Sequence, residues 1–239
     1  MRTKFICLLI MLMAAGSQQL FAHALWIETN PTGKKEKAQE VKIYFGEFAD
    51  KDISLTEKWF SDLKDFSLVV ITPGKQRIKL TATAKTEYYS AMFTPTEDGV
   101  YTLVMHHIVK EVYHNMKLDY NSSATVVVGN QFEGNDAFVN PNIVSLFSVS
   151  AFSVKENREM KMLALLGNKI AAEQEVKVFA PNGWAKELYS SEKGEVIFTP
   201  LWPGKYMAEF AYTDKSPGEH NGKKYDEVWK VATYIITVK

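Results

Sequence analysis

Phe93-Thr94-Pro95-Thr96-Glu97-Asp98-Gly99-Val100-Tyr101-Thr102-Leu103 joins two segments of alternating apolar residues through a turn rich in Pro, Asp and Gly. A turn of this composition leads an aromatic-containing strand back into a sheet, and it is typical of the edge of an immunoglobulin-type sandwich. Strands with one apolar face are therefore the unit from which we expect this chain to be built.

The same period of two extends along the chain on both sides of this stretch. We expect strands at residues 25–29, 40–45, 67–71, 77–82, 87–93, 99–108, 120–128, 144–152, 160–166, 175–180, 185–190, 195–199, 205–213 and 228–238. Turns such as Pro181-Asn182-Gly183 and Trp202-Pro203-Gly204 separate most of the later segments. This spacing predicts an all-β fold of two tandem antiparallel immunoglobulin-like β-sandwich modules.

One segment departs from the strand pattern. Ser54-Leu55-Thr56-Glu57 matches a capping box, in which the serine side chain and the glutamate side chain each satisfy a backbone amide at the start of a helix. Apolar residues then follow at helical spacing as far as Leu63. A short helix is therefore expected near residues 55–64, inserted between strands.

The first residues have the pattern of a secretory signal peptide. A basic start precedes an apolar run from Phe5 to Ala15 and a polar segment, so residues 1–22 are expected to be removed. Cleavage after Ala22 makes His23 the first residue of the mature chain. Cleavage after Ala24 is the alternative, because Ala22-His23-Ala24 is also an A-x-A site, and it would remove His23.

The remaining chain divides by composition into two parts. We expect a signal peptide at 1–22, an N-terminal β-sandwich at 23–128, a linker rich in Gly, Asn, Asp and Pro at 129–141, and a C-terminal β-sandwich at 142–239. About 215 residues with a high apolar content are enough to form a sizeable core. The run from Glu175 to Phe210 resembles the transthyretin-like or collagen-adhesin-B-like modules of many exported proteins, which are usually scaffolds.

Charge and cysteine content exclude several classes of protein. The chain has 28 basic and 28 acidic residues, and loss of Arg2 and Lys4 with the signal leaves 26 against 28, a net charge of −2. Binding to nucleic acid is not expected from this balance. The only cysteine, Cys7, lies in the signal, and no later run approaches the ~20 apolar residues of a membrane helix. A periplasmic location with no membrane span in the mature chain is the simplest interpretation.

Catalytic motifs are missing from the sequence, so an enzyme is not expected. The sequence has no G-x-S-x-G, S-x-x-K, H-E-x-x-H, Walker or dinucleotide motif. The candidate ligating groups are five histidines, all in the mature chain. His106 and His107 are adjacent in a strand and must point to opposite faces, so at most one of them contributes to a given site.

These histidines suggest a metal site. A mature chain that begins with His23 holds an amine and an imidazole within chelating distance of one ion. We expect His107 to supply a further nitrogen and His220 or His114 an optional fourth, a ligand set that suits Ni, Co or Cu. The alternative interpretation is that histidines at strand ends and in loops are ordinary structural or surface residues.

Several motifs resemble a known family of exported proteins. They are His-Ala-Leu-Trp-Ile-Glu-Thr after the signal, Val-Lys-Ile-Tyr-Phe-Gly-Glu-Phe-Ala, Asp-Gly-Val-Tyr-Thr-Leu before a histidine, and Gly-Lys-Lys-Tyr-Asp-Glu-Val-Trp. The chain is similar here to the exported domain-of-unknown-function 4198 family, periplasmic components of nickel or cobalt uptake. The resemblance implies a mostly β periplasmic protein with an N-terminal histidine, His23, and a second histidine at His107. His220 is a weaker match.

Three functional hypotheses follow. The first is a periplasmic binding protein for a transition-metal ion or metal chelate, accessory to an uptake transporter or an outer-membrane receptor. The second is a non-enzymatic glycan-, peptide- or receptor-binding sandwich without metal, for which the tryptophans and tyrosines would supply a stacking surface. The third is an oxidative copper enzyme in which His23 and one facing histidine form a histidine brace.

Overall fold

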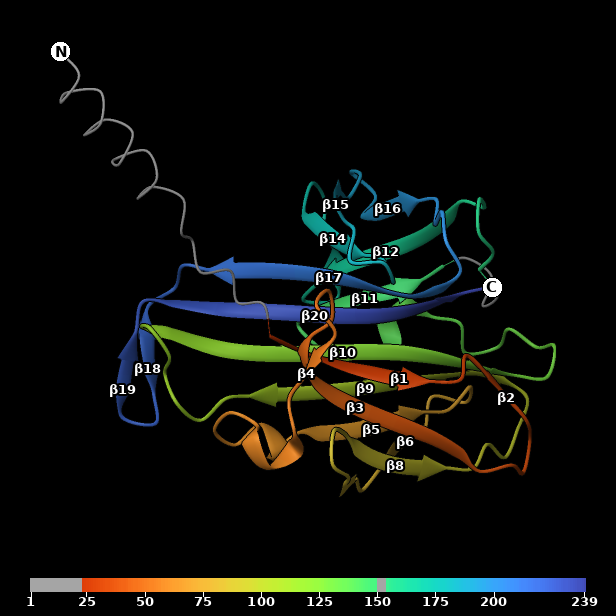
Figure 1. Ribbon diagram of the computed structural model, residues 1–239, viewed down its shortest axis with the longest axis horizontal. Coiled ribbons are helices and arrows are strands. Elements are labelled where there is room, and N and C mark those ends of the chain that lie inside the picture. Colours follow the sequence, from red (N-terminus) through yellow and green to blue (C-terminus); the bar gives the residue numbers. More distant parts are fainter. Residues whose placement is uncertain (1–22, 150–153) are drawn as a thin grey trace, which may run out of the picture.

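The computed structural model describes residues 23–149 and 154–239 (Figure 1). The predicted signal peptide, with Cys7 inside it, lies outside the described residues. The described chain consists of strands and three short 3-10 helices, and it contains no α-helix. The all-β class predicted from the period-two pattern is therefore confirmed.

A central sheet runs through both halves of the chain. In the described residues it has nine strands, which are in spatial order β15 (Ala185–Tyr189), β14 (Glu175–Phe179), β17 (Gly204–Asp214), β20 (Glu227–Val238), β10 (Met116–Val128), β9 (Gly99–Ile108), β5 (Ser67–Ile71) and β6 (Arg77–Lys79), with β2 (Thr32–Gly33) beside β10. Figure 1 shows β17, β20, β10 and β9 side by side through the middle of the molecule.

The two halves of the chain meet at β10 and β20. These strands pair in parallel from Met116 opposite Glu227 to Ser123 opposite Tyr234, whereas the other principal pairs of the central sheet are antiparallel. One sheet thus passes through both predicted modules. The structure therefore does not confirm a simple tandem of separate immunoglobulin-like sandwiches.

Two smaller sheets cover the central sheet. The N-terminal cover sheet has the order β1 (Ala24–Thr29), β3 (Gln39–Glu47), β8 (Tyr89–Phe93) and β7 (Thr83–Ala84), with β4 (Asp52–Ile53) on β3. The C-terminal cover sheet has the order β11 (Val144–Ser148), β12 (Met160–Leu166) and β13 (Lys169–Ile170), with β16 (Glu195–Phe198) on β12. The strands β18 (Gly218–His220) and β19 (Lys223–Tyr225) form a separate hairpin.

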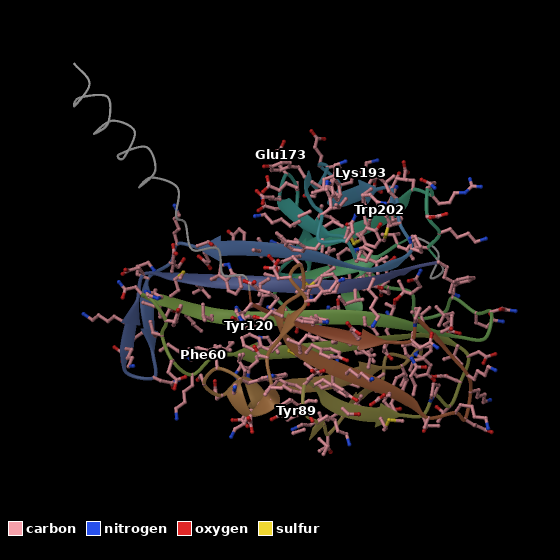
Figure 2. All side chains as sticks on the ribbon, in the orientation of Figure 1. Phe60, Tyr89, Tyr120, Glu173, Lys193 and Trp202 are labelled. Atoms are coloured by element: carbon pink, nitrogen blue, oxygen red, sulfur yellow. The ribbon has the colours of Figure 1, made fainter. Side chains whose placement is uncertain are left out.

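The alternation of β20 places the two covers on opposite faces of the central sheet. Trp229 and Val231 belong to the core beneath the N-terminal cover, whereas Ala232 and Tyr234 belong to the core beneath the C-terminal cover. Successive side chains of a strand point to opposite faces, so a strand buried on both sides needs apolar residues at nearly every position. Figure 2 labels one residue of each core: Tyr120 of β10 belongs to the core beneath the N-terminal cover, and Trp202 packs against the core beneath the C-terminal cover.

The edge of the N-terminal cover sheet is closed by hydroxyl groups of the central sheet. Ile27 N–H donates to Ser122 Oγ at 3.1 Å, and Thr233 Oγ1 donates to the Leu25 carbonyl at 2.7 Å. Backbone groups of an edge strand are otherwise left without partners when they are buried. These bonds fix β1 against β10 and β20, and they thereby fix the position of His23 just before it.

Two tyrosines hold equivalent corners in the two halves. The Tyr101 hydroxyl accepts from the backbone N–H of Thr96 and Glu97 and donates to the Glu97 carbonyl, at 3.0–3.1 Å. The Tyr206 hydroxyl likewise accepts from Trp202 N–H and donates to its carbonyl, each at 3.0 Å. Such tyrosine corners recur in Greek-key sandwiches. The turn before Tyr101 leads from β8 of the N-terminal cover sheet to β9 of the central sheet, so it does lead an aromatic-containing strand into a sheet.

The helix predicted near residues 55–64 is wrong. Two 3-10 helices, η1 (Thr56–Lys58) and η2 (Leu63–Asp65), occupy the segment, and a third, η3 (Ala137–Val139), lies in the predicted linker. The capping box does not form, because Leu55 rather than Ser54 precedes η1 and no side chain caps it.

The physical reason for this difference is the packing of Trp59. Its backbone is extended, its indole lies 4.9 Å from the Tyr89 ring, and its Nε1 donates to the Ser54 carbonyl at 3.2 Å. Leu63 is fully buried in the same core. A helix of two or three turns is only marginally stable by itself. The burial of Trp59 and Leu63 in the core therefore determines the backbone conformation of this segment.

Candidate functional site

His107, predicted as a metal ligand, is bonded inside the protein. Its ring is buried, and its Nε2 lies 3.0 Å from Asp62 Oδ1, which also accepts from Lys110 N–H at 3.0 Å. Although burial of Asp62 opposes ionisation, the hydrogen bonds from Lys110 and His107 outweigh it and hold the pKa of this carboxyl below its usual value. The pair ties η2 to the end of β9.

Three further histidines each make their own contacts, and two of them, His220 and His114, were predicted ligands. His220 Nε2 donates to the Val109 carbonyl at 3.0 Å. His114 has a positive φ of 45° in a turn, with its ring edge-on to Tyr113 at 4.3 Å. His106 faces the opposite side of β9 and bonds to the buried Asp119 at 3.0 Å.

His23 occupies the start of β1, and its surroundings are acidic. The residue is exposed, and its ring centroid lies 5.4 Å from that of Phe45. Ala24 pairs with Gly46, so the next residue of β3, Glu47, is a close neighbour of His23. Burial and a hydrogen bond with the Asp50 carboxyl raise the pKa of Glu47, and His23 acts in the opposite direction.

The described residues do not gather the predicted histidines into one cluster. No group of three or more His, Cys, Asp or Glu side chains in residues 23–149 and 154–239 is arranged to hold a metal ion. What the structure does bring together at the start of β1 is one histidine and the carboxyl groups of Glu47 and Asp50.

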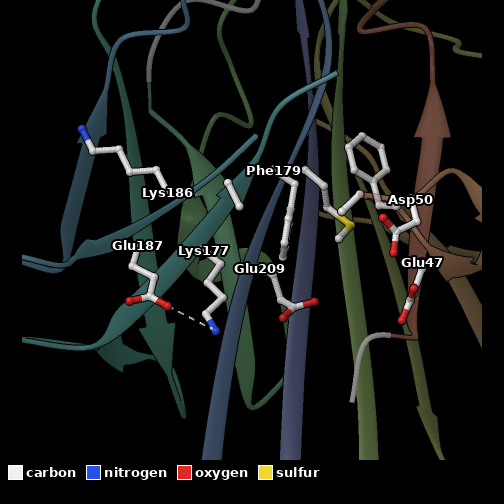
Figure 3. A pocket seen from close by; sticks show the side chains of 11 residues that line it. Glu47, Asp50, Lys177, Phe179, Lys186, Glu187 and Glu209 are labelled. Atoms are coloured by element: carbon white, nitrogen blue, oxygen red, sulfur yellow. Dashed lines mark ion pairs between the residues drawn. The ribbon is translucent and has the colours of Figure 1, made fainter. Parts of the chain in front are cut away.

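Those two carboxyl groups line a pocket between the β3–β4 turn and the outer strands of the central sheet. The pocket has a volume of about 560 Å³. Its lining combines apolar and charged side chains, namely Glu47, Phe48, Ala49, Asp50, Lys177, Phe179, Ala185, Lys186, Glu187, Met207 and Glu209 (Figure 3). A volume of this size is within the range of small-molecule sites.

The position of the pocket follows from the architecture. The N-terminal cover sheet reaches β17 through a small apolar cluster that includes Trp26 and Met207, with Phe48 and Phe179 packed against it. Beyond that cluster, β14 and β15 continue the central sheet. The pocket is formed where the β3–β4 turn overhangs this part of the sheet.

Glu209 is the unusual residue of this pocket. It lies opposite Lys177 in the pairing of β14 with β17. The Lys177 ammonium nevertheless lies 3.5 Å from Glu175 and 3.5 Å from Glu187, its two ion-pair partners in the described chain. Burial raises the pKa of Glu209 to about 7, and Lys177 only partly opposes the rise.

A second hollow adjoins the pocket along β1. It has a volume of about 310 Å³ and shares Glu47 and Phe48 with the pocket. An ion pair between Glu28 and Lys205 crosses its rim, and Glu28 also accepts from Trp26 Nε1 at 3.1 Å. Glu28, Lys205 and Trp26 are therefore paired within the protein.

Sequence reasoning missed Glu47, Asp50 and Glu209 as site residues. One signal was present, because Glu209 is an acid between apolar neighbours in the strand Tyr206-Met207-Ala208-Glu209-Phe210. The alternation places it on the same face as Met207. The approach of the β3–β4 turn to this face depends on the packing of two sheets, which no local pattern contains.

The aromatic residues proposed as a stacking surface mostly belong to the core. Trp26, Trp59 and Trp229 are buried. Trp184 is exposed, but its ring meets that of Trp202 edge-on at 6.1 Å and therefore does not extend a flat platform.

Comparisons with known proteins do not assign a family. No family model matches the chain, and no curated protein matches it in sequence. The resemblance to the exported domain-of-unknown-function 4198 family therefore stays a prediction. In the described residues, no helix is long and apolar enough to span a membrane.

Solved structures show only distant similarity. A DUF4785 family protein from Legionella pneumophila has a TM-score of 0.34 and 11% identity, covering 81% of this chain and 52% of that one. A Salmonella alpha-2-macroglobulin has a TM-score of 0.28 and 8% identity, covering 91% of this chain and 15% of that one. The chain thus spans about half the length of the first and a small part of the second. These scores carry no argument about function.

Proposed function

We propose that this chain is a non-enzymatic periplasmic protein that binds a transition-metal ion, or a small metal chelate, at its mature N-terminus. The observation that supports this proposal is the position of His23 beside Glu47, whose carboxyl group lines the pocket. The ion would then be passed to an uptake transporter or an outer-membrane receptor, in keeping with the family resemblance of the opening motif.

The donor set fits such an ion. Cleavage after Ala22 would give His23 a free amine next to its imidazole, and the neighbouring Glu47 would add a carboxylate oxygen. Nitrogen ligands of this kind favour Ni, Co, Cu or Zn over Mg or Ca. His107 and His220 are engaged with Asp62 and the Val109 carbonyl, so we replace them in the ligand set by the Glu47 carboxylate.

Native mass spectrometry of protein purified from the periplasm tests this proposal. We expect a mass that begins at His23 and one retained ion when Ni, Co, Cu and Zn are offered together at low concentration. His23→Ala and Glu47→Gln should abolish retention of the ion, because each removes a donor. His114→Ala is the matched control and should leave retention unchanged, since His114 lies in a separate turn.

Four results would contradict the proposal. A mass that begins at Leu25 would show that His23 is absent from the mature protein. A chain that begins at His23 but retains no ion would favour the glycan-, peptide- or receptor-binding alternative. Loss of the ion in His220→Ala together with retention in His23→Ala would point to a site elsewhere. Oxygen consumption in the presence of copper and a reductant would favour the histidine-brace enzyme.

A further inference from the structure

We propose that the pocket between the β3–β4 turn and strands β14, β15 and β17 binds a small organic cation with an apolar body, and that Glu209 receives its positive group. This inference goes beyond the proposed metal function, because it concerns the sheet side of the pocket and requires neither a metal ion nor a free amine at His23.

The Glu209 carboxyl has no hydrogen-bond or ion-pair partner in the described chain. Residues directly opposite each other in an antiparallel pair have Cβ atoms about 5 Å apart, so Lys177 is within reach of Glu209. Lys177 instead lies at ion-pair distance from Glu175 and Glu187. Within the described chain no hydrogen bond or ion pair reaches the Glu209 carboxyl, which leaves its oxygens for a ligand.

Apolar side chains line the pocket beside this carboxyl. Phe48 comes from the β3–β4 turn, Phe179 from β14 and Met207 from β17, and all three line the pocket with Glu209. An apolar pocket with a few placed polar groups is the usual form of a small-molecule site. An unpartnered carboxylate among such walls selects a ligand that is apolar over most of its surface and positive at one end.

The side chains that line the pocket carry more negative than positive charge. Four carboxyl groups face two lysines there, and one of the lysines is the paired Lys177. Figure 3 shows the Lys186 side chain extending away from Glu209, while Glu47 and Asp50 lie across the pocket from Lys177. A cation is therefore favoured over an anion of the same shape.

Titration of Glu209 gives the proposal a pH signature. Because burial raises the pKa of Glu209 to about 7, a cation that requires the ionised form should bind more tightly as the pH rises through neutrality. The other titratable groups around it are Lys177 of β14, Lys186 and Glu187 of β15, Glu47 and Asp50 of β3 and its turn, and Tyr120 of β10.

Isothermal titration calorimetry of the mature protein with 2-phenylethylammonium tests the proposal, with EDTA present to remove metal ions. We expect saturable binding that strengthens with pH. The neutral analogue 2-phenylethanol and the anion phenylacetate should bind at least about tenfold more weakly, since they lack the charge-assisted contact.

Variants assign the effect to Glu209. Glu209→Gln should weaken binding of 2-phenylethylammonium at least about tenfold, because it removes the charge and keeps the shape. Lys177→Gln should strengthen binding, because it removes the nearest positive charge. Glu173→Gln alters an exposed carboxyl outside the pocket lining and should leave affinity unchanged. Far-ultraviolet circular dichroism verifies that each variant is folded.

The proposal is overturned if 2-phenylethylammonium does not bind, if 2-phenylethanol binds equally well, or if folded Glu209→Gln keeps full affinity. Should Glu209→Gln not fold, Lys177→Gln decides, and unchanged or weaker binding in that variant would reject the proposal. A metal titration of the same samples separates the two proposals, since His23→Ala should lose the ion and keep the organic cation.

Discussion

Two regions of the central sheet, the end of β9 and the pocket beside β17, differ in whether their polar side chains have partners within the protein. Near the end of β9, His107 bonds to Asp62, and His220 bonds to the Val109 carbonyl. In the pocket beside β17, Glu209 is half-buried, and its cross-strand neighbour Lys177 is paired elsewhere. A buried polar group with a partner stabilises the fold, whereas one without a partner costs stability and remains free to bind a ligand.

The largest effect on stability is expected at the pair formed by His107 and Asp62. His107→Ala should lower the free energy of unfolding by about 3 kcal/mol, because it removes a buried ring and leaves Asp62 without one of its donors. Urea denaturation at neutral pH measures this change. His114→Ala should shift the same free energy by less than about 0.5 kcal/mol. Equal effects of the two substitutions would show that the His107 pair does not stabilise the fold.

An effect of opposite sign is expected in the pocket. Glu209→Gln should raise the free energy of unfolding by about 2 kcal/mol at mildly alkaline pH, because the folded protein no longer holds a charge in a desolvated position. The wild-type protein should lose this stability as the pH rises from 4.5 to about 7, the window in which only the folded state keeps the proton.

Urea denaturation of wild type and Glu209→Gln at several pH values checks this prediction. The two proteins should be equally stable well below pH 4.5, where Glu209 is protonated in both the folded and the unfolded state. A substitution that destabilises the protein at every pH would mean that Glu209 has a partner after all.

A smaller effect is expected where β1 meets the central sheet. Thr233→Val keeps the shape of a fully buried side chain but removes the hydroxyl that donates to the Leu25 carbonyl and is hydrogen-bonded to Ser122 Oγ. It should lower the free energy of unfolding by about 1 kcal/mol. Binding of 2-phenylethylammonium should be unchanged, because Thr233 does not line the pocket. A large loss of binding would place the ligand closer to β1 than we propose.

The strands could be predicted from the sequence because their signal is local. Alternating residues such as those of β3 and β17, with turn residues between strands, were enough to place every principal strand. The short strands, such as β13 and β18, carry no comparable pattern. The parallel contact of β10 with β20 joins residues more than 100 positions apart, and nothing in either segment specifies its partner.

The candidate site was less predictable for the same reason. His23 was identified because a cleavage signal precedes it, which is a local feature. The histidines proposed beside it were grouped by residue type, whereas their actual partners are an aspartate and a backbone carbonyl brought near by folding. Glu47 and Glu209 come from different halves of the chain and share one pocket only after the sheets have packed.

Titration of the Glu209 carboxyl by ¹³C NMR, with and without 2-phenylethylammonium, tests the central claim most directly. We predict a pKa near 7 in the free protein, as burial without a partner requires, and a lower pKa when the cation is bound. A pKa in the ordinary range of glutamate, unchanged by the cation, would contradict the account. It would mean that the Glu209 carboxyl is either solvated or already paired.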